Sequence, residues 1–209
     1  MAVTGPGCRT ELRFEHSGSW ALGCAKCDAL VLRDGTRFPG ATVDMPMVED
    51  LSPLRVGSAG TWNEKQFRVT GRVRVESERG YRNYWSLRGD VPYAWLAQAF
   101  GTYALIGLSA EKVEKDEVRG AKPTRSLKLD PGEPYHVEML DNRFRHAWEG
   151  ELMKPLPMPW SIEIEAGRPP NGKAILLVDK ATNVHALIGE MVEYTDLRIE
   201  NPPALGQWT

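Results

Sequence analysis

Cys8, Cys24 and Cys27 are the only cysteines in the chain, and all three lie near its start. Cys24 and Cys27 form a C-x₂-C pair, and a zinc ribbon combines two such pairs separated by about 15 to 20 residues. Fifteen residues separate Cys8 from Cys24, so Cys8 fits the end of the first pair. The position three residues before Cys8, which would carry the fourth thiolate, is Gly5. The pattern predicts either a metal site with an unusual fourth ligand or a ribbon that has lost its metal.

The identity of a fourth ligand is open at this stage. Zinc is the cofactor that the spacing indicates, because a tetrahedral thiolate site can fold a segment too small to bury its own core. His16, in the stretch FEHSGSW, is the nearest candidate ligand. A residue from another part of the chain and a water molecule are the other candidates. The remaining interpretation is a metal-free relic that is held in shape by packing on the rest of the protein.

A second group of candidates is a stripe of arginines. In FRVTGRVRVE, Arg68, Arg72 and Arg74 alternate with valines, and this period of two predicts a strand with one buried face. The arginines would then stand on the exposed face, where they could meet the phosphates of a nucleic acid. The alternative is a solvated face of mixed charge, which nearby glutamates and the net charge of −2 favour.

The sequence carries no catalytic signature. It lacks a nucleophile elbow, a phosphate-binding loop and a dinucleotide-binding fingerprint. Glu149 and Glu151 flank Gly150 and are expected to point into solvent with no partner base. Cys24 and Cys27 precede an apparent strand, whereas a thioredoxin-like redox pair opens a helix. We therefore expect a protein that is not an enzyme.

Short alternating segments separated by Gly, Asp and Pro predict a mainly β protein. The expected architecture is a rubredoxin-like or zinc-ribbon-like knuckle followed by two small antiparallel modules, each a barrel or a sandwich. The predicted boundaries are a degenerate ribbon at 1–37, a linker at 38–53, a first β module at 54–108, a charged connection at 109–126, a second β module at 127–200 and a tail at 201–209.

Composition places the chain among ordinary globular proteins, with 42% hydrophobic and 26% charged residues in 209. Its apolar runs are too short to span a bilayer, and the first residues do not resemble a signal peptide. Cysteines confined to one cluster do not suggest a disulfide framework. These features predict a cytoplasmic location, with membrane association only through a partner.

The order of several motifs resembles a bacterial family known as domain of unknown function 4178. The segments that carry the resemblance are DLSPLRVGSAGTW, FRVTGRVRVE, GYRNYWSL, WLAQAFGTYALI and WEGEL. The family pattern begins with paired C-x₂-C knuckles, so Gly5 departs from it. Arg82 and Tyr84 also stand where the family tends to have Trp and Glu. The resemblance implies an accessory protein, in a context of polyamine synthesis or membrane-associated stress proteins.

The leading functional hypothesis is a non-enzymatic adaptor that binds a protein partner. Aromatic residues on β hairpins make good interface anchors, so Trp62, Tyr81, Tyr84 and Trp85 are the predicted contact residues, with core packing as their alternative role. A nucleic-acid-binding module that uses the ribbon and the arginine stripe is the second hypothesis. An enzyme acting on a polyamine-related substrate is the third.

Overall fold

The computed structural model describes residues 1–39, 45, 47, 52–110, 113–129, 131–179, 183–200 and 202. Most of the predicted linker at 38–53 and of the tail at 201–209 lies outside these residues. The described part is mainly β, as predicted, with one short helix, α1 (Lys115–Val118), and one 3₁₀ turn, η1 (Tyr194–Leu197). The strands are β1 (Ala2–Thr4), β2 (Glu11–Arg13), β3 (Ala21–Gly23), β4 (Leu30–Leu32), β5 (Ala59–Trp62), β6 (Lys65–Ser77), β7 (Gly80–Gly89), β8 (Trp95–Ala99), β9 (Thr102–Leu108), β10 (Ser126–Leu127), β11 (Tyr135–Asn142), β12 (Arg145–Leu152), β13 (Trp160–Arg168), β14 (Gly172–Asp179) and β15 (Val184–Val192).

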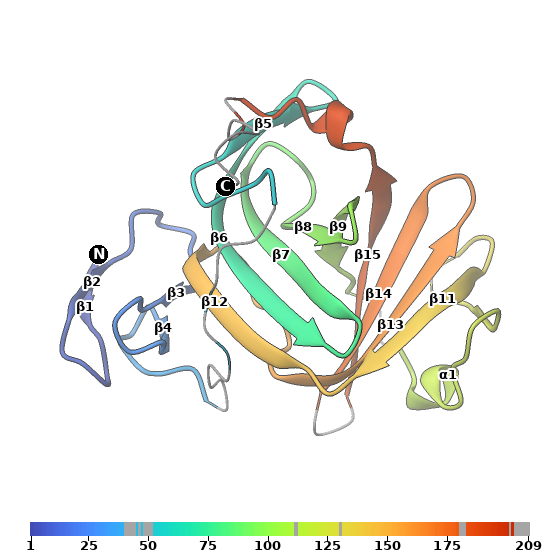
Figure 1. Cartoon of the computed structure of the whole chain (residues 1–209), viewed down its shortest axis with the longest axis horizontal. Coiled ribbons are helices and arrows are strands. Elements are labelled where there is room, and N and C mark those ends of the chain that lie inside the picture. Colours follow the sequence, from blue (N-terminus) through green and yellow to red (C-terminus); the bar gives the residue numbers. More distant parts are fainter. Residues whose placement is uncertain are drawn as a thin grey trace.

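All strand pairs are antiparallel, and they form two sheets. β1 and β2 make a separate hairpin, whereas the other strands follow the order β10-β11-β13-β14-β15-β9-β8-β7-β6-β12-β3-β4, with β5 added beside β6. The large sheet curls strongly (Figure 1), but its end strands β10 and β4 do not pair, so the described strands do not form a closed barrel. The antiparallel β architecture is confirmed.

The predicted halves 54–108 and 127–200 share this one sheet. β12 pairs with β6, and β15 pairs with β9, so hydrogen-bonded ladders join the halves at two places. The main hydrophobic cluster also takes residues from both halves, such as Val73 and Tyr84 from the first and Trp160 and Leu177 from the second. The division into two modules stays a prediction. A single continuous sheet connects residues 54–108 with residues 127–200.

Strand β6 has the buried face that its sequence predicts, but most of its other face is buried as well. It is a strand, and Val73 and Val75 are fully buried, as the alternation predicts. Arg72 and Arg74 are also buried, so the expectation of an exposed stripe is wrong for them, and only Arg68 is exposed. Side chains from the neighbouring strands β7 and β12 cover both guanidinium groups, because the curled sheet places large residues on both of its faces.

Each buried guanidinium has specific partners. Arg72 forms an ion pair with Glu149 at 2.7 Å between Nη2 and Oε1, and its Cζ lies 4.8 Å from the centroid of the Trp85 ring. Arg74 donates from Nε to Asn83 Oδ1 at 3.2 Å and stacks over Tyr81. A buried charge is tolerated when it is paired and hydrogen-bonded. These arginines therefore stabilise the pairing of β6 with β7 and β12 and are not available to a nucleic acid in this conformation.

The N-terminal segment lies beside the curled sheet (Figure 1) and joins it through β12. β12 pairs with β6 as far as Gly150, and then Glu151 and Leu152 pair with β3. Gly150 has a φ of +68°, and a Cβ at this position would lie 2.4 Å from the carbonyl oxygen of Thr70. Glycine is required at this crossing because any side chain would meet the backbone of β6.

Glu151 is the anchor of this junction, and the expectation that it points into solvent is wrong. It is only 5% exposed, and its carboxylate accepts hydrogen bonds from the amides of Glu15 and His16 and from Ser19 Oγ. Burial raises the pKa of Glu151, but these hydrogen bonds outweigh that effect and hold the pKa below its usual value. The ionised carboxylate thus fixes the loop between β2 and β3 to the large sheet.

We predict that Gly150→Ala lowers the free energy of unfolding by about 2 to 4 kcal/mol, because alanine is strained at positive φ and its methyl group would collide with β6. Gly107→Ala in β9 is the matched control, since a Cβ there meets no heavy atom within 4 Å. Urea denaturation of both variants measures the difference. Equal stabilities would contradict the close approach at Gly150.

Candidate functional site

The three cysteines lie in two loops of the same construction. The first loop joins β1 to β2, and the second joins β3 to β4. In each loop the first residue donates its amide to a carbonyl five residues later and accepts a hydrogen bond from the amide four residues later. These bonds are Gly5 N to Thr10 O (2.7 Å) and Arg9 N to Gly5 O (3.0 Å) in one loop, and Cys24 N to Ala29 O (2.9 Å) and Asp28 N to Cys24 O (2.8 Å) in the other.

The backbone dihedrals of the loops match as well. The residue after each loop has a left-handed conformation, with φ of 57° at Arg9 and 55° at Asp28. The loops are therefore equivalent residue by residue. Cys8 corresponds to Cys27, and Gly5 corresponds to Cys24. We call these paired loops the knuckles, and they bring the sulfur atoms of Cys8, Cys24 and Cys27 together.

The sulfur atoms are placed as a metal ion would require. The Sγ atoms of Cys8, Cys24 and Cys27 all lie within 4.8 Å of one another, and those of Cys8 and Cys24 are 3.6 Å apart. A tetrahedral zinc ion with zinc–sulfur bonds of about 2.3 Å separates its sulfur ligands by about 3.8 Å. The three cysteines are free thiols, so no disulfide accounts for their closeness. The residues present fit a thiophilic metal ion.

Gly5 occupies the position of a missing fourth ligand. A Cβ built on Gly5 would lie 3.2 Å from Cys8 Sγ and 3.7 Å from Cys24 Sγ, so its side chain would enter the thiol cluster. Among the described residues, no histidine or carboxylate joins the three cysteines to complete a larger group of ligands. The described residues therefore offer three sulfur ligands, and Gly5 places no side chain at the fourth position.

His16, the predicted candidate for the fourth ligand, lies elsewhere. Its Nδ1 is 3.3 Å from Glu151 Oε2, and its amide donates to the same carboxylate oxygen. It therefore belongs to the junction between the knuckles and the large sheet. The predicted hairpin around His16 exists as a loop, but it turns toward β12.

The surroundings of the thiols differ between the two loops. A hydrogen bond with Thr10 is the main reason why the pKa of the Cys8 thiol is lowered to about 7. Burial raises the pKa of Cys24, which the amides of Lys26 and Cys27 partly offset by donating hydrogen bonds to its sulfur. Amide donors of this kind orient and stabilise thiolate ligands.

The predicted partner-contact residues are mostly buried. Trp62 packs in the second hydrophobic cluster with Trp85, and Tyr84 packs in the main cluster against Trp160. Tyr81 is 45% exposed and is the one member of the predicted set that an interface could use in this conformation. The position of the other three agrees with core packing.

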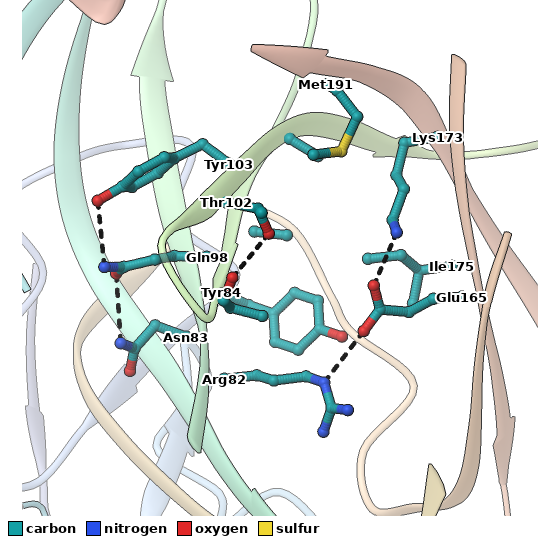
Figure 2. Close-up of a pocket in the computed structure, with 13 residues that line it drawn as sticks. Arg82, Asn83, Tyr84, Gln98, Thr102, Tyr103, Glu165, Lys173, Ile175 and Met191 are labelled. Carbon is teal, nitrogen blue, oxygen red and sulfur yellow. Dashed lines mark hydrogen bonds and ion pairs between the residues drawn. The ribbon is translucent and has the colours of Figure 1, made fainter. Parts of the chain in front are cut away.

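A buried polar cluster inside the curled sheet was missed by the sequence analysis, and Figure 2 shows its residues Arg82, Glu165 and Lys173. Arg82 on β7 lies 3.1 Å from Asp141 on β11 and 3.1 Å from both Glu163 and Glu165 on β13. Lys173 on β14 adds an ion pair with Glu165 at 2.7 Å. β7 and β13 are not neighbours in the sheet, so these contacts require the sheet to curl until its inner face meets itself.

The sequence offers a weak signal for this cluster. Glu163 and Glu165 alternate with isoleucines in WSIEIEA, and that pattern alone predicts a solvent-facing row of acids. The cavity beside the cluster measures about 20 Å³, enough for about one water molecule. Arg82 and Lys173 offset the charges of Asp141 and Glu165, so the cluster links β7, β11, β13 and β14 through buried ion pairs.

Glu163 is the most buried carboxyl group of the cluster. Its side chain is 1% exposed, and burial raises its pKa to about 7, although the nearby guanidinium of Arg82 opposes this change. Trp160 Nε1 donates to its other oxygen at 3.2 Å. Near neutral pH the carboxyl group is therefore partly protonated in the folded protein.

Comparisons with protein-family models, with curated proteins and with solved structures returned no match for this chain. In the part of the chain that the structure describes, no helix has the length and apolar character needed to cross a membrane. The functional interpretation therefore depends on the geometry of the chain itself.

We predict that Glu163→Gln flattens the pH dependence of stability. The folded state holds this proton up to about pH 7, whereas the unfolded state releases it near pH 4.5, so the unfolding free energy of the native protein falls as the pH rises between these values. The variant should be more stable than the native protein at pH 8, by on the order of 2 kcal/mol. Urea denaturation at pH 5 and pH 8 measures the change.

Glu133→Gln is the matched control, because Glu133 is exposed. It should leave the difference between pH 5 and pH 8 unchanged. If Glu163→Gln shows the same pH dependence as the native protein, Glu163 is ionised throughout this range.

Proposed function

We propose that the protein is a non-enzymatic adaptor whose N-terminal residues form a ribbon that binds one thiophilic metal ion. The observation that carries the proposal is the equivalence of the two knuckle loops, which brings Cys8, Cys24 and Cys27 within 4.8 Å of one another. The thiols form no disulfide, so all three are available as metal ligands. Zinc is the ion that the ribbon spacing favours.

The small core of the ribbon supports the need for a metal. Its buried hydrophobic residues are Cys24, Ala29 and Val31, with few partly buried neighbours. A core of this size stabilises a segment weakly, and a bound metal ion adds free energy that the packing cannot provide. The metal would join the first hairpin, which carries Cys8, to the second hairpin, which carries Cys24 and Cys27.

An adaptor also needs a surface for its partner, and two exposed aromatic residues support one. Tyr81 is 45% exposed at the β6–β7 turn, and Phe100 is 61% exposed at the β8–β9 turn. The turns lie side by side, because Arg82 pairs with Ala99. Arg74 and Arg82 stack against the Tyr81 and Phe100 rings, respectively, which limits the motion of both rings.

The resemblance to domain of unknown function 4178 remains part of the proposal. It agrees with an accessory role and with a ribbon ahead of a β-rich body. The cytoplasmic location and the protein partner are likewise proposals, and the adaptor role depends on the metal site and on the exposed aromatic surface.

We predict that the full-length protein, purified under reducing conditions and titrated at micromolar concentration, binds close to one zinc ion per chain. Cys24→Ser should abolish this binding because it removes the most buried sulfur ligand. His16→Ala is the matched control and should bind zinc as the native protein does, since His16 contacts Glu151. Metal analysis by mass spectrometry gives the stoichiometry. Zinc retained by Cys24→Ser, or lost from His16→Ala, would contradict the assigned ligands.

We further predict that the double substitution of Tyr81 and Phe100 by serine removes a specific partner from affinity capture without changing the thermal stability by more than a few degrees. Leu108→Ser is the matched control, because Leu108 is 49% exposed at the end of β9. Quantitative mass spectrometry compares the captured proteins. An identical set from the double variant and the native protein would exclude this surface as the interface.

A further inference from the structure

The fourth coordination position of the knuckle pair decides which ion the site can hold. Structural zinc is almost always bound by four ligands in a tetrahedron. The equivalence of Gly5 with Cys24 shows where the fourth ligand would enter, and Gly5 has no side chain to supply it. The question is whether another group of the protein can take that position.

The side-chain position of Gly5 faces the thiol cluster. Gly5 is buried, and a Cβ at this position would lie 3.2 Å from Cys8 Sγ and 3.4 Å from the carbonyl oxygen of Thr10. A cysteine at position 5 would therefore direct its side chain into the thiol cluster, whereas the native first loop contributes one sulfur atom, from Cys8.

The other polar groups near the cluster do not replace the missing thiolate. Thr10 Oγ1 lies 3.2 Å from Cys8 Sγ and accepts its hydrogen bond, and a neutral hydroxyl is a weak ligand for a soft ion. His16 is held against Glu151. The described residues therefore supply three sulfur atoms and no fourth donor group within the cluster.

We propose that this is a three-thiolate site that favours a soft monovalent ion of the Cu(I) type over zinc, and that Gly5 determines this preference. The inference rests on the proposed metal-binding function and specifies its metal. Soft thiolate ligands select Cu(I), which is satisfied by three sulfur atoms, whereas Zn²⁺ with three thiolates lacks a ligand. The amides of Lys26 and Cys27, which donate to Cys24 Sγ, stabilise the excess negative charge of such a complex.

The test compares metal affinities of the full-length native protein with those of Gly5→Cys and Gly5→Ser. The measurements are made without oxygen, with a phosphine as the reductant so that no added thiol binds the metal. Zinc affinity is measured by competition with a chromophoric chelator, and Cu(I) affinity by competition with bathocuproine disulfonate. Gly5→Ser is the matched control, because serine has nearly the shape of cysteine but offers a weak ligand.

We expect Gly5→Cys to raise the zinc affinity by about 100-fold or more and the Cu(I) affinity by less than about tenfold, while Gly5→Ser raises the zinc affinity by less than about tenfold. Equal zinc affinities of the native protein and Gly5→Cys would overturn the inference, because the native site would then have a fourth ligand of its own. Failure of the native protein to bind either ion would overturn the metal-binding function itself.

A second measurement does not depend on the folding of any variant. X-ray absorption spectroscopy of the native protein loaded with Cu(I) counts the sulfur ligands directly. A single shell of three sulfur atoms supports the inference. A shell of two sulfur atoms, or a fourth ligand of any kind, overturns it.

Discussion

The structure depends on one strand that joins the curled body to the N-terminal residues. β12 pairs with β6 up to Gly150 and then with β3, so one continuous sheet connects the two parts. The crossing is possible because Gly150 allows the two backbones to approach, and because the buried carboxylate of Glu151 satisfies the amides of Glu15 and His16. A loop that would otherwise bury unpaired donors is thereby fixed to the sheet.

The curl of the sheet explains why charged residues are buried at so many places. A flat antiparallel sheet exposes one face, whereas this sheet bends until Arg82 on β7 meets Glu163 and Glu165 on β13. Its other face carries aromatic residues such as Trp85, which lies over Arg72. Each buried guanidinium has carboxylate, amide or ring partners, and such pairing makes the burial tolerable without making it a strong source of stability. The pairs also fix which strands face each other.

Local patterns in the sequence predicted the strands, but they did not predict contacts between residues far apart in the chain. The spacing of Cys8, Cys24 and Cys27 predicted that the three thiols would lie together, and they do. The alternation of valines located β6. The same alternation placed Arg72 and Arg74 in solvent, because a period of two indicates which residues share a face and gives no information on what covers that face. Glu151 was misplaced for the same reason, since its partners are more than 130 residues away in sequence. The two-module division likewise could not include the pairing of β9 with β15.

The two knuckles are stabilised unequally, and this difference bears on the role of a metal. The second knuckle is held without one, because β3 pairs with β12 and Trp148 Nε1 donates to the carbonyl oxygen of Asp28 at 3.0 Å. The first knuckle lies on the separate β1–β2 hairpin, whose residues meet the second knuckle through Cys8, Val3 and Leu12. The proposed metal ion would therefore link the first hairpin to one that already pairs with the large sheet. One thiolate from the first hairpin would be sufficient for that link, so a glycine at position 5 is compatible with it.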